Sequence, residues 1–128
     1  METATSVNHR ITVISNSNFE TEVLCTEKPV LLMCMLQGQE YSEQIRVLKQ
    51  VLETYDGLIG MRRLEEDFIN GFKQMYSIKG TPVFLLFHEG KEKGRMLGMA
   101  DRERLEAFLT QNLPQCSLET RMEPLAQT

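Results

Sequence analysis

The sequence predicts an α/β protein with a central mixed sheet of about five strands flanked by about four helices. The first observation behind this prediction is the order of segments, because apolar strand-like runs alternate with helical patterns along most of the 128 residues. The second is a late pair of strand-like segments joined by a tight polar turn with glycine at residues 88–91. Alternation requires crossovers and parallel strands, whereas the hairpin adds an antiparallel edge.

The first third of the chain is expected to form a strand, a helix and a second strand. The sequence Ile-Thr-Val-Ile at residues 11–14 indicates a short strand. Ser17 and Glu20 have the spacing of a capping box, which predicts a helix to about residue 24. The continuous apolar run at residues 30–36 is typical of a strand buried on both faces, as in a parallel sheet covered by helices.

A polar corner and a long amphipathic helix follow the second strand. Residues 37–42 are polar, and Ser42 has the side chain that commonly caps a helix. From there to Tyr55 the apolar residues recur on one helical face. Gly57 is a natural left-handed stop for that helix. Residues 58–64 then form the expected third strand.

The next helix and strand are predicted from residue spacing and from one proline. Asp67 is placed to cap the third helix. The apolar face of this helix is expected to comprise Phe68, Phe72, Met75 and Tyr76. Pro82 directly precedes the strand expected at residues 83–87. Proline has no N–H to give a ladder, so it is tolerated at the first residue of a strand and hardly at all inside one.

A fifth strand and a last helix complete the expected fold. The turn at residues 88–91 leads to a strand near residues 93–97. Gly98 ends that strand, and Asp101 is placed to cap the helix that follows. The spacing of Leu105, Phe108 and Leu109 predicts the core stripe of this helix.

Length and composition limit the number of domains and the classes of partner. We expect one domain at residues 10–112, between a loose tail at residues 1–9 and a disordered tail at residues 113–128. The net charge of −4, without a dense basic face, argues against a nucleic-acid partner. The longest apolar run is too short to span a membrane. Because the N-terminus has no features of a secretory signal, we expect a cytoplasmic protein, and the sequence leaves its oligomeric state open.

Three cysteines and two histidines show no metal-ligand spacing. We therefore expect no metal and no cofactor. Cys34 is interpreted as a small apolar filler within its strand. Cys25 and Cys116 are candidates for exposure, and a disulfide between them is disfavoured in a reducing cytoplasm. His9 and His88 are interpreted as surface residues.

Several local patterns, taken in order, resemble the thioredoxin-like superfamily. They are Lys28-Pro29-Val30-Leu31-Leu32, Tyr55-Asp56-Gly57, Asp67, Tyr76-Ser77-Ile78-Lys79-Gly80-Thr81-Pro82, Phe87 with Gly90, and Gly98. The resemblance covers about residues 10 to 112 and implies a thioredoxin fold. It also implies that the bond before Pro82 is cis, whereas an X-Pro bond in general is cis in only about 5% of cases in folded proteins.

The chain differs from that family at the two active-site cysteines. Anchoring the comparison on the second strand places these positions at Gln39 and Ser42, whereas anchoring it on the following helix places them at Gly38 and Tyr41. Neither alternative provides a thiol, so the Cys-x-x-Cys motif is absent. A thiolate at a helix N-terminus and a second, resolving thiol are what dithiol exchange needs. Dithiol oxidoreductase activity is therefore not expected.

The family's buried aspartate, which assists proton transfer, is replaced as well. Met33 stands in its place in the first alignment and Leu32 in the second. Neither side chain can carry a proton. Arg63 stands where the family often has a lysine, although the Arg62-Arg63 pair is also typical of a solvated face.

The resemblance implies a surface that could bind a peptide at the cis-proline. Met35 is a further candidate for an apolar patch there, whereas Met33, Met61 and Met75 are expected to fill the core. The candidate binding residues are Gln39, Tyr41, Ser42, Thr81, Pro82 and Met99. Thr81 would pair its backbone with an extended protein or peptide partner.

The predicted function is a non-catalytic thioredoxin-like protein with an adaptor or chaperone-like role. The alternative is a residual monothiol or glutathione-linked oxidoreductase in cell redox homeostasis, which would use Cys34 or Cys25. In a third possibility the domain is structural or regulatory, and residues 113–128 carry the interaction.

Overall fold

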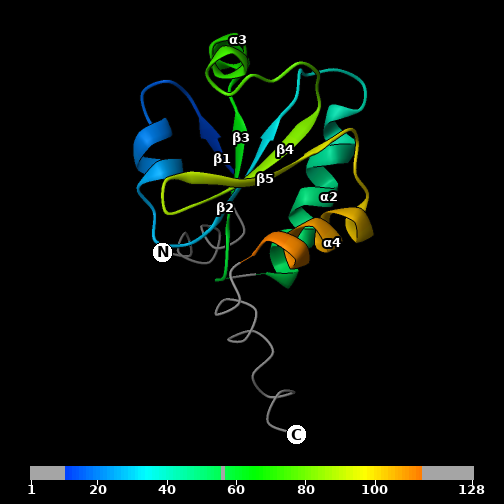
Figure 1. Cartoon of the computed structure of the whole chain (residues 1–128). Helices are drawn as coiled ribbons and strands as arrows, with labels where there is room; N and C mark the ends of the chain where they lie inside the picture. The colour runs from blue at the N-terminus through cyan, green and yellow to red at the C-terminus, as the bar shows by residue number, and fades with distance from the viewer. Residues whose placement is uncertain (1–10, 56, 114–128) are drawn as a thin grey trace, which may run out of the picture.

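The computed structural model of the chain describes residues 11–55 and 57–113. The strands are β1 (Ile11–Ile14), β2 (Val30–Cys34), β3 (Gly60–Leu64), β4 (Val83–His88) and β5 (Lys91–Leu97), and the helices are η1 (Glu20–Leu24), α2 (Tyr41–Thr54), α3 (Glu66–Met75) and α4 (Arg102–Asn112). Within the described residues they form a mixed sheet with helices on both faces (Figure 1). The predicted α/β class and element order are confirmed. The tails expected at residues 1–9 and 113–128 lie outside the described residues, except for Leu113, which is buried in the α2/α4 layer.

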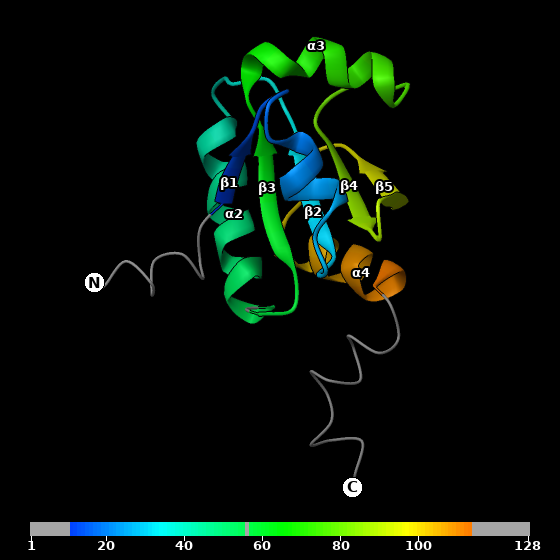
Figure 2. The ribbon, with the colours of Figure 1, turned by 90° about the vertical axis from the view of Figure 1, so that its left-hand side faces the viewer.

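The sheet has the order β1-β3-β2-β4-β5. β1 and β2 pair with β3 in parallel, whereas β4 is antiparallel to β2, and β5 is antiparallel to β4. The antiparallel part thus begins at β4, one strand earlier than the hairpin alone predicts. The reason is the position of α3, which lies across the end of the sheet instead of running back along it (Figure 2). β4 therefore starts where β2 and β3 finish, with Val83 beside Cys34.

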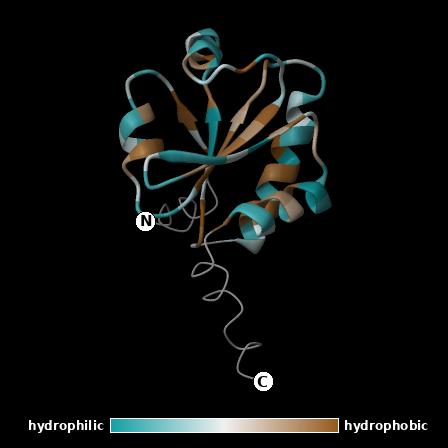
Figure 3. Ribbon diagram, in the orientation of Figure 1, coloured by the Kyte–Doolittle hydropathy of each residue, from teal (hydrophilic) through white to brown (hydrophobic). Residues whose placement is uncertain are grey.

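Two apolar layers enclose the sheet, and β2 contributes to both. We call them the α2/α4 layer and the η1/α3 layer after the helices that cover them. All five residues of β2 are buried. Leu31 and Met33 face the α2/α4 layer, while Val30, Leu32 and Cys34 face the η1/α3 layer. The prediction of a strand buried on both faces is confirmed, and β2 and β4 stand out as apolar beside the polar β5 (Figure 3).

Aromatic side chains form the centre of the η1/α3 layer. Phe19 makes edge-on contacts with four other rings at centroid distances of 5.7 to 6.2 Å. These rings are Phe68, Phe72, Tyr76 and Phe87. Met75 was expected among them, but its side chain is 55% exposed. The expectation is wrong because Met75 is the last residue of α3, and Ile69 fills the layer in its place.

Two of the local signals in the sequence are confirmed at the ends of elements. Asp101 caps α4, since its carboxylate accepts a hydrogen bond from the backbone N–H of Arg104 at 2.9 Å. The hairpin between β4 and β5 has Glu89 and Gly90 at φ 57° and 78°, which is the geometry of a two-residue loop with a left-handed turn.

Three other capping predictions are wrong. Ser17 does not cap η1, because the preceding turn is closed by Asn18, whose side chain accepts from Ser15 N and donates to Val13 O. In α3 the N-cap is Glu65, so Asp67 lies inside the first turn. In α2 it is Glu40, and Ser42 also lies inside the helix. No side-chain hydrogen bond caps any of these three helices.

Arg62 is an anchor between η1 and the sheet, and not part of a solvated face as expected. Its side chain is only 15% exposed and forms an ion pair with Glu22 at 3.5 Å. Its Nε donates to the backbone oxygen of Glu22 at 3.0 Å. Burial lowers the pKa of the Arg62 guanidinium, and the charge of Glu22 opposes that change.

Among the described helices, none is both long and apolar enough to cross a membrane.

Candidate functional site

Three segments meet at one end of the sheet because of the strand register. Cys34 ends β2 beside Val83, the first residue of β4, and Val83 lies beside Leu97, the last residue of β5. The chain therefore leaves β2, enters β4 and leaves β5 at the same end. We call the surface formed there by the first turn of α2, Thr81-Pro82 and residues 98–100 the candidate face.

Hydrogen bonds join the three segments of this face. The backbone N–H of Gly98 donates to Pro82 O at 2.8 Å. The side chain of Gln44, in the second turn of α2, bonds both polar groups of Ala100: Nε2 donates to its carbonyl at 2.8 Å, and Oε1 accepts from its N–H at 3.0 Å. Gln44 is 0% exposed and is the one buried polar side chain among the described residues. A polar group at that depth is stable only when it is hydrogen-bonded, so Gln44 holds the 98–100 turn against α2.

Arg104 supports the same turn from the first turn of α4. Its guanidinium donates to the carbonyl oxygen of Met99 at 2.6 Å and to that of Leu97 at 2.8 Å. Gly98 lies at φ 102°, a backbone conformation that side-chain-bearing residues rarely adopt. The turn is therefore fixed on both sides, by Gln44 and by Arg104.

The residues proposed from the sequence fall into two groups in the structure. Thr81, Pro82 and Met99 are half-buried, and the Thr81-Pro82 peptide bond is cis. Met99 packs against the α2/α4 layer and, with Gln44, borders a hollow of about 230 Å³.

The second group lies at the start of α2. Tyr41 is the first residue of α2 and is half-buried, whereas Ser42 is exposed. Gln39 is exposed and comes just before the N-cap, Glu40, so it lies in the loop and not on the helix.

The exposed apolar residues at this end of the sheet differ from those expected. Met35, proposed as part of a surface patch, is buried in the α2/α4 layer. Leu36, the next residue, is 51% exposed instead. Leu97 is 61% exposed and lies beside Gly80, where an added Cβ would be 3.8 Å from its Cδ1. The strand pattern of β5 could have indicated Leu97, since every second residue of β5 is exposed.

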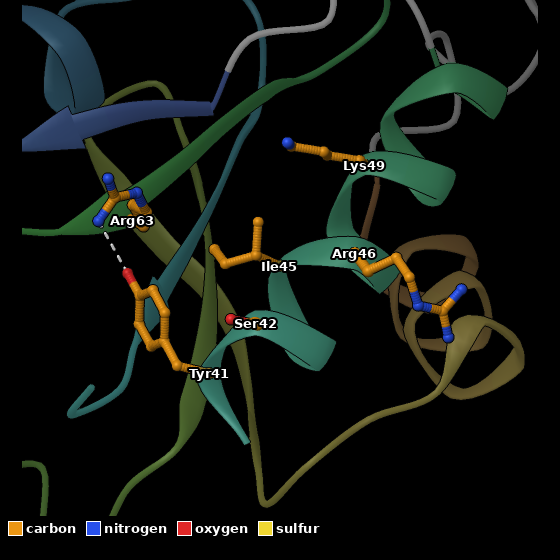
Figure 4. Close-up of a pocket in the computed structure, with 6 residues that line it drawn as sticks. All are labelled: Tyr41, Ser42, Ile45, Arg46, Lys49 and Arg63. Carbon is orange, nitrogen blue, oxygen red and sulfur yellow. Dashed lines mark hydrogen bonds between the residues drawn. The ribbon is translucent and has the colours of Figure 1, made fainter. Parts of the chain in front are cut away.

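Arg63 lies beside α2 and forms a polar contact with Tyr41. Its Nη1 donates to the Tyr41 hydroxyl at 2.8 Å, and its guanidinium carbon is 5.8 Å from the centre of the tyrosine ring (Figure 4). Met33 is the register partner of Arg63, while Leu32 pairs with Arg62 and faces the other layer. Of the two residues that could replace the family's aspartate, Met33 is therefore the one next to Arg63.

Neither described cysteine belongs to the candidate face. Cys34 is completely buried in the η1/α3 layer. Burial raises the pKa of its thiol to about 11, and the nearby charge of Lys73 only partly opposes this. Cys25 is exposed, but it lies before β2 and so at the other end of the sheet, where Leu24 approaches Gly90 of the hairpin. Cys116 lies outside the described residues.

In residues 11–55 and 57–113 no cluster of three or more His, Cys, Asp or Glu side chains could hold a metal ion. The candidate face thus consists of backbone groups, apolar side chains and the polar side chains of Tyr41, Ser42 and Glu43, and Arg63 of β3 lies beside it through its contact with Tyr41. These groups can bind an extended chain.

Known proteins similar to this chain include thioredoxins. No protein-family model matches the chain. A thioredoxin from Acidithiobacillus ferridurans is 29% identical over 104 residues, which cover 80% of this chain and 96% of the relative. One from Pseudomonas aeruginosa is 26% identical over 108 residues, covering 84% and 100%. Thioredoxin C-2 from Corynebacterium nephridii is 28% identical over 100 residues, covering 77% and 93%.

The fold and the face define a protein built on the thioredoxin plan, with a mixed sheet, a long helix after β2 and a proline at the start of β4. Together with these relatives, they identify the chain as a member of the thioredoxin-like superfamily. Its own sequence has no Cys-x-x-Cys, since the three cysteines are Cys25, Cys34 and Cys116.

Proposed function

We propose that the protein is a non-catalytic member of the superfamily that binds a peptide or a partner protein at the candidate face. Its role is that of an adaptor or a chaperone-like helper, and we place it in the cytoplasm. The bound segment is extended and forms main-chain hydrogen bonds with Thr81, as an added strand does. These hydrogen bonds supply affinity, and adjacent side chains supply selectivity.

The observation that carries this proposal is the backbone of Thr81. Within the described residues, no protein group hydrogen-bonds to its N–H or its C=O. Leu97 lies beside Gly80, and Leu36 follows β2 two residues after Cys34, the register partner of Val83. Both side chains have more than half of their surface exposed. An extended peptide could satisfy both polar groups of Thr81 and cover these apolar side chains at the same time.

The positions of the thiols support a binding role over the alternative redox role. No cysteine lies in the corner before α2, and the Cys34 thiol, with its raised pKa, is protonated at neutral pH. A thiol needs to be a thiolate to act as a nucleophile. Cys25 is the accessible thiol of the described residues, so a monothiol role would depend on it.

Affinity capture of partners from the native cell extract tests the proposal. We expect Thr81→Arg to lower the yield of captured partner by about tenfold or more, the scale of one lost hot-spot contact. Met99→Glu should act in the same direction. Thr110→Arg makes the same substitution at an exposed position on α4 and should leave capture unchanged. Circular dichroism would verify that each variant is folded.

Three results would decide against the proposal. The first is equal capture by the wild type and Thr81→Arg. The second is turnover in an insulin-reduction assay that is lost on Cys25→Ser, which would favour the monothiol alternative. Capture that disappears when residues 114–128 are deleted, with the candidate face intact, would assign the interaction to that segment instead.

A further inference from the structure

An open hollow of about 420 Å³ adjoins the candidate face on the side of α2. It lies between the first turns of α2 and the middle of β3 (Figure 4). The residues that line it are Tyr41, Ser42, Ile45, Arg46, Lys49 and Arg63. Tyr41 and Ser42 also belong to the first turn of α2 and hence to the candidate face, so the two surfaces are continuous.

The lining of the hollow carries three positive charges and no negative one. Arg46 is already neutralised, because two nitrogen atoms of its guanidinium donate to the carboxylate of Glu43. Its side chain also points away from the other lining residues in Figure 4. Lys49 and Arg63 remain, and within the described residues neither forms an ion pair with a carboxylate.

Arg63 has unused hydrogen-bond donors in this position. A guanidinium has five N–H donors, and here one of them is used by the Tyr41 hydroxyl. The same hydrogen bond fixes the orientation of the guanidinium plane, and the tyrosine ring lies alongside it. An oriented guanidinium binds a carboxylate with little loss of side-chain entropy. Lys49 extends from α2 toward the same space in Figure 4 and adds a second positive charge.

The apolar part of the lining distinguishes a side-chain carboxylate from a small free anion. Ile45 lies between Lys49 and the Tyr41–Arg63 pair in Figure 4 and is half-buried against the α2/α4 layer. A glutamate or aspartate that enters the hollow would place its methylene groups on Ile45 and the tyrosine ring, and its carboxylate near the two cations. A free inorganic anion would leave this apolar surface unused.

We propose that this hollow is the subsite for an acidic side chain of the bound peptide. The inference rests on the proposed function, since the peptide reaches the hollow from the candidate face. The partner is accordingly a protein segment that pairs apolar residues, placed at Thr81-Pro82, with a glutamate or aspartate placed between Lys49 and Arg63. Because the hollow is open to solvent, binding at this subsite weakens as the salt concentration rises.

A random linear peptide library displayed on phage provides a probe that does not require the natural partner. Peptides selected on the wild-type protein are synthesised with and without the acidic residue, as Glu→Gln twins, and their affinities are measured by fluorescence polarisation. We expect an acidic residue in the selected sequences and about tenfold weaker binding of the Gln twin, the size of one lost hydrogen bond between charged groups.

The decisive measurement is a double-mutant cycle between protein and peptide. In the Lys49→Gln/Arg63→Gln variant, the Glu peptide should bind about tenfold more weakly, and the Glu and Gln twins should bind equally. Lys91→Gln is the matched control for Lys49→Gln, since it removes one lysine charge at the hairpin, at the opposite end of the sheet, and it should preserve the difference between the twins. If Arg63→Gln alters the fold, Lys49→Gln alone still tests the coupling, because its side chain is exposed.

The two proposals fail in different ways. Binding that Thr81→Arg leaves unchanged, or a library that yields no binder, overturns the proposed function and the subsite with it. In a second case, Thr81→Arg weakens peptide binding, but the Glu and Gln twins differ in affinity by the same factor in the wild type and in the Lys49→Gln/Arg63→Gln variant. This result overturns the subsite alone. Selected sequences without acidic residues do the same. A phosphoserine twin that binds more tightly than the glutamate parent would assign the hollow to phosphate instead.

Discussion

The two layers of the core are built from different chemistry. The η1/α3 layer consists of packed rings and aliphatic side chains, with Cys34 as a small filler. The α2/α4 layer is mainly aliphatic and rich in methionine, with Tyr55, Phe84 and Phe108 as its buried aromatic residues, and it contains the buried amide of Gln44. The Tyr41–Arg63 contact lies at its margin.

This difference separates stability from recognition. Phenylalanine rings bury a large apolar area and have no polar group that needs a hydrogen-bond partner, so the η1/α3 layer mainly stabilises the fold. The amide of Gln44 stabilises only one arrangement, since it has two fixed partners on Ala100. The α2/α4 layer therefore determines the shape of the candidate face, and the predictions below test this division of roles.

Phe72→Ala should have the largest effect, and on stability alone. The Phe72 side chain is completely buried and contacts Phe19, Phe68 and Tyr76. We expect the free energy of unfolding to fall by about 3–5 kcal/mol, from lost burial and the cavity left behind. Urea unfolding followed by circular dichroism measures the loss.

Met75→Ala is the matched control on the same helix, and it should change stability by less than about 0.5 kcal/mol because Met75 is exposed. Peptide affinity of the folded Phe72→Ala protein should equal that of the wild type. A tenfold loss of affinity would show that the η1/α3 layer also shapes the candidate face, against the division drawn above.

Gln44→Met should affect both properties. The substitution keeps the length of the side chain but leaves the N–H and C=O of Ala100 buried without partners. We expect a loss of about 3 kcal/mol in the free energy of unfolding, from two unsatisfied groups. Peptide affinity should fall as well, because the 98–100 turn is no longer held against α2. Amide hydrogen exchange at Ala100 reports on the turn directly.

Gln50→Met makes the same change on the same helix at a half-buried position and should leave affinity and exchange at Ala100 unaltered. If Gln44→Met lowered stability without accelerating that exchange, Gln44 would have a packing role only.

The thiol of Cys34 should make a smaller contribution that depends on pH. Its pKa rises from 9.0 to about 11 on burial. Between these values the unfolded chain loses the proton and the folded chain keeps it, so stability decreases as pH rises. Below about pH 8 both states are protonated and the effect vanishes. Relative to Cys34→Ala, the wild type should lose up to about 2–3 kcal/mol between pH 8 and pH 11.

Urea unfolding of both proteins at several pH values measures this difference, and the comparison cancels the lysines and tyrosines that titrate in the same range. A difference between the two proteins that stays constant from pH 8 to pH 11 would mean that water reaches the thiol in the folded state.

Some local signals in the sequence were informative, although the capping predictions for Ser17, Ser42 and Asp67 were wrong. Asp101 and the glycine of the hairpin could be assigned because a cap and a tight turn depend on a few neighbouring residues. The continuous apolar run of β2 likewise predicted burial on both faces. The same reasoning failed for Met75, whose helical spacing is right but which lies beyond the edge of the layer.

The parts of the site that could not be predicted depend on distant partners. Gln44 looks like an ordinary polar residue of an amphipathic helix, and its partner Ala100 is 56 residues away. Arg62 and Arg63 are adjacent in sequence, yet they point to opposite faces of the sheet and bind different groups. Leu36 ends an apolar run, but β2 stops at Cys34, so its side chain is exposed.

The hydrogen bonds from Gln44 to Ala100 and from Gly98 to Pro82 have a consequence for the time at which the face can form. Protein domains are synthesised from the N-terminus, and α2 leaves the ribosome well before residues 98–100. Until that turn has emerged and docked, the nascent chain has the helix and the proline but not the surface that they form together. A partner that recognises this surface therefore binds the completed domain and not the chain during its synthesis.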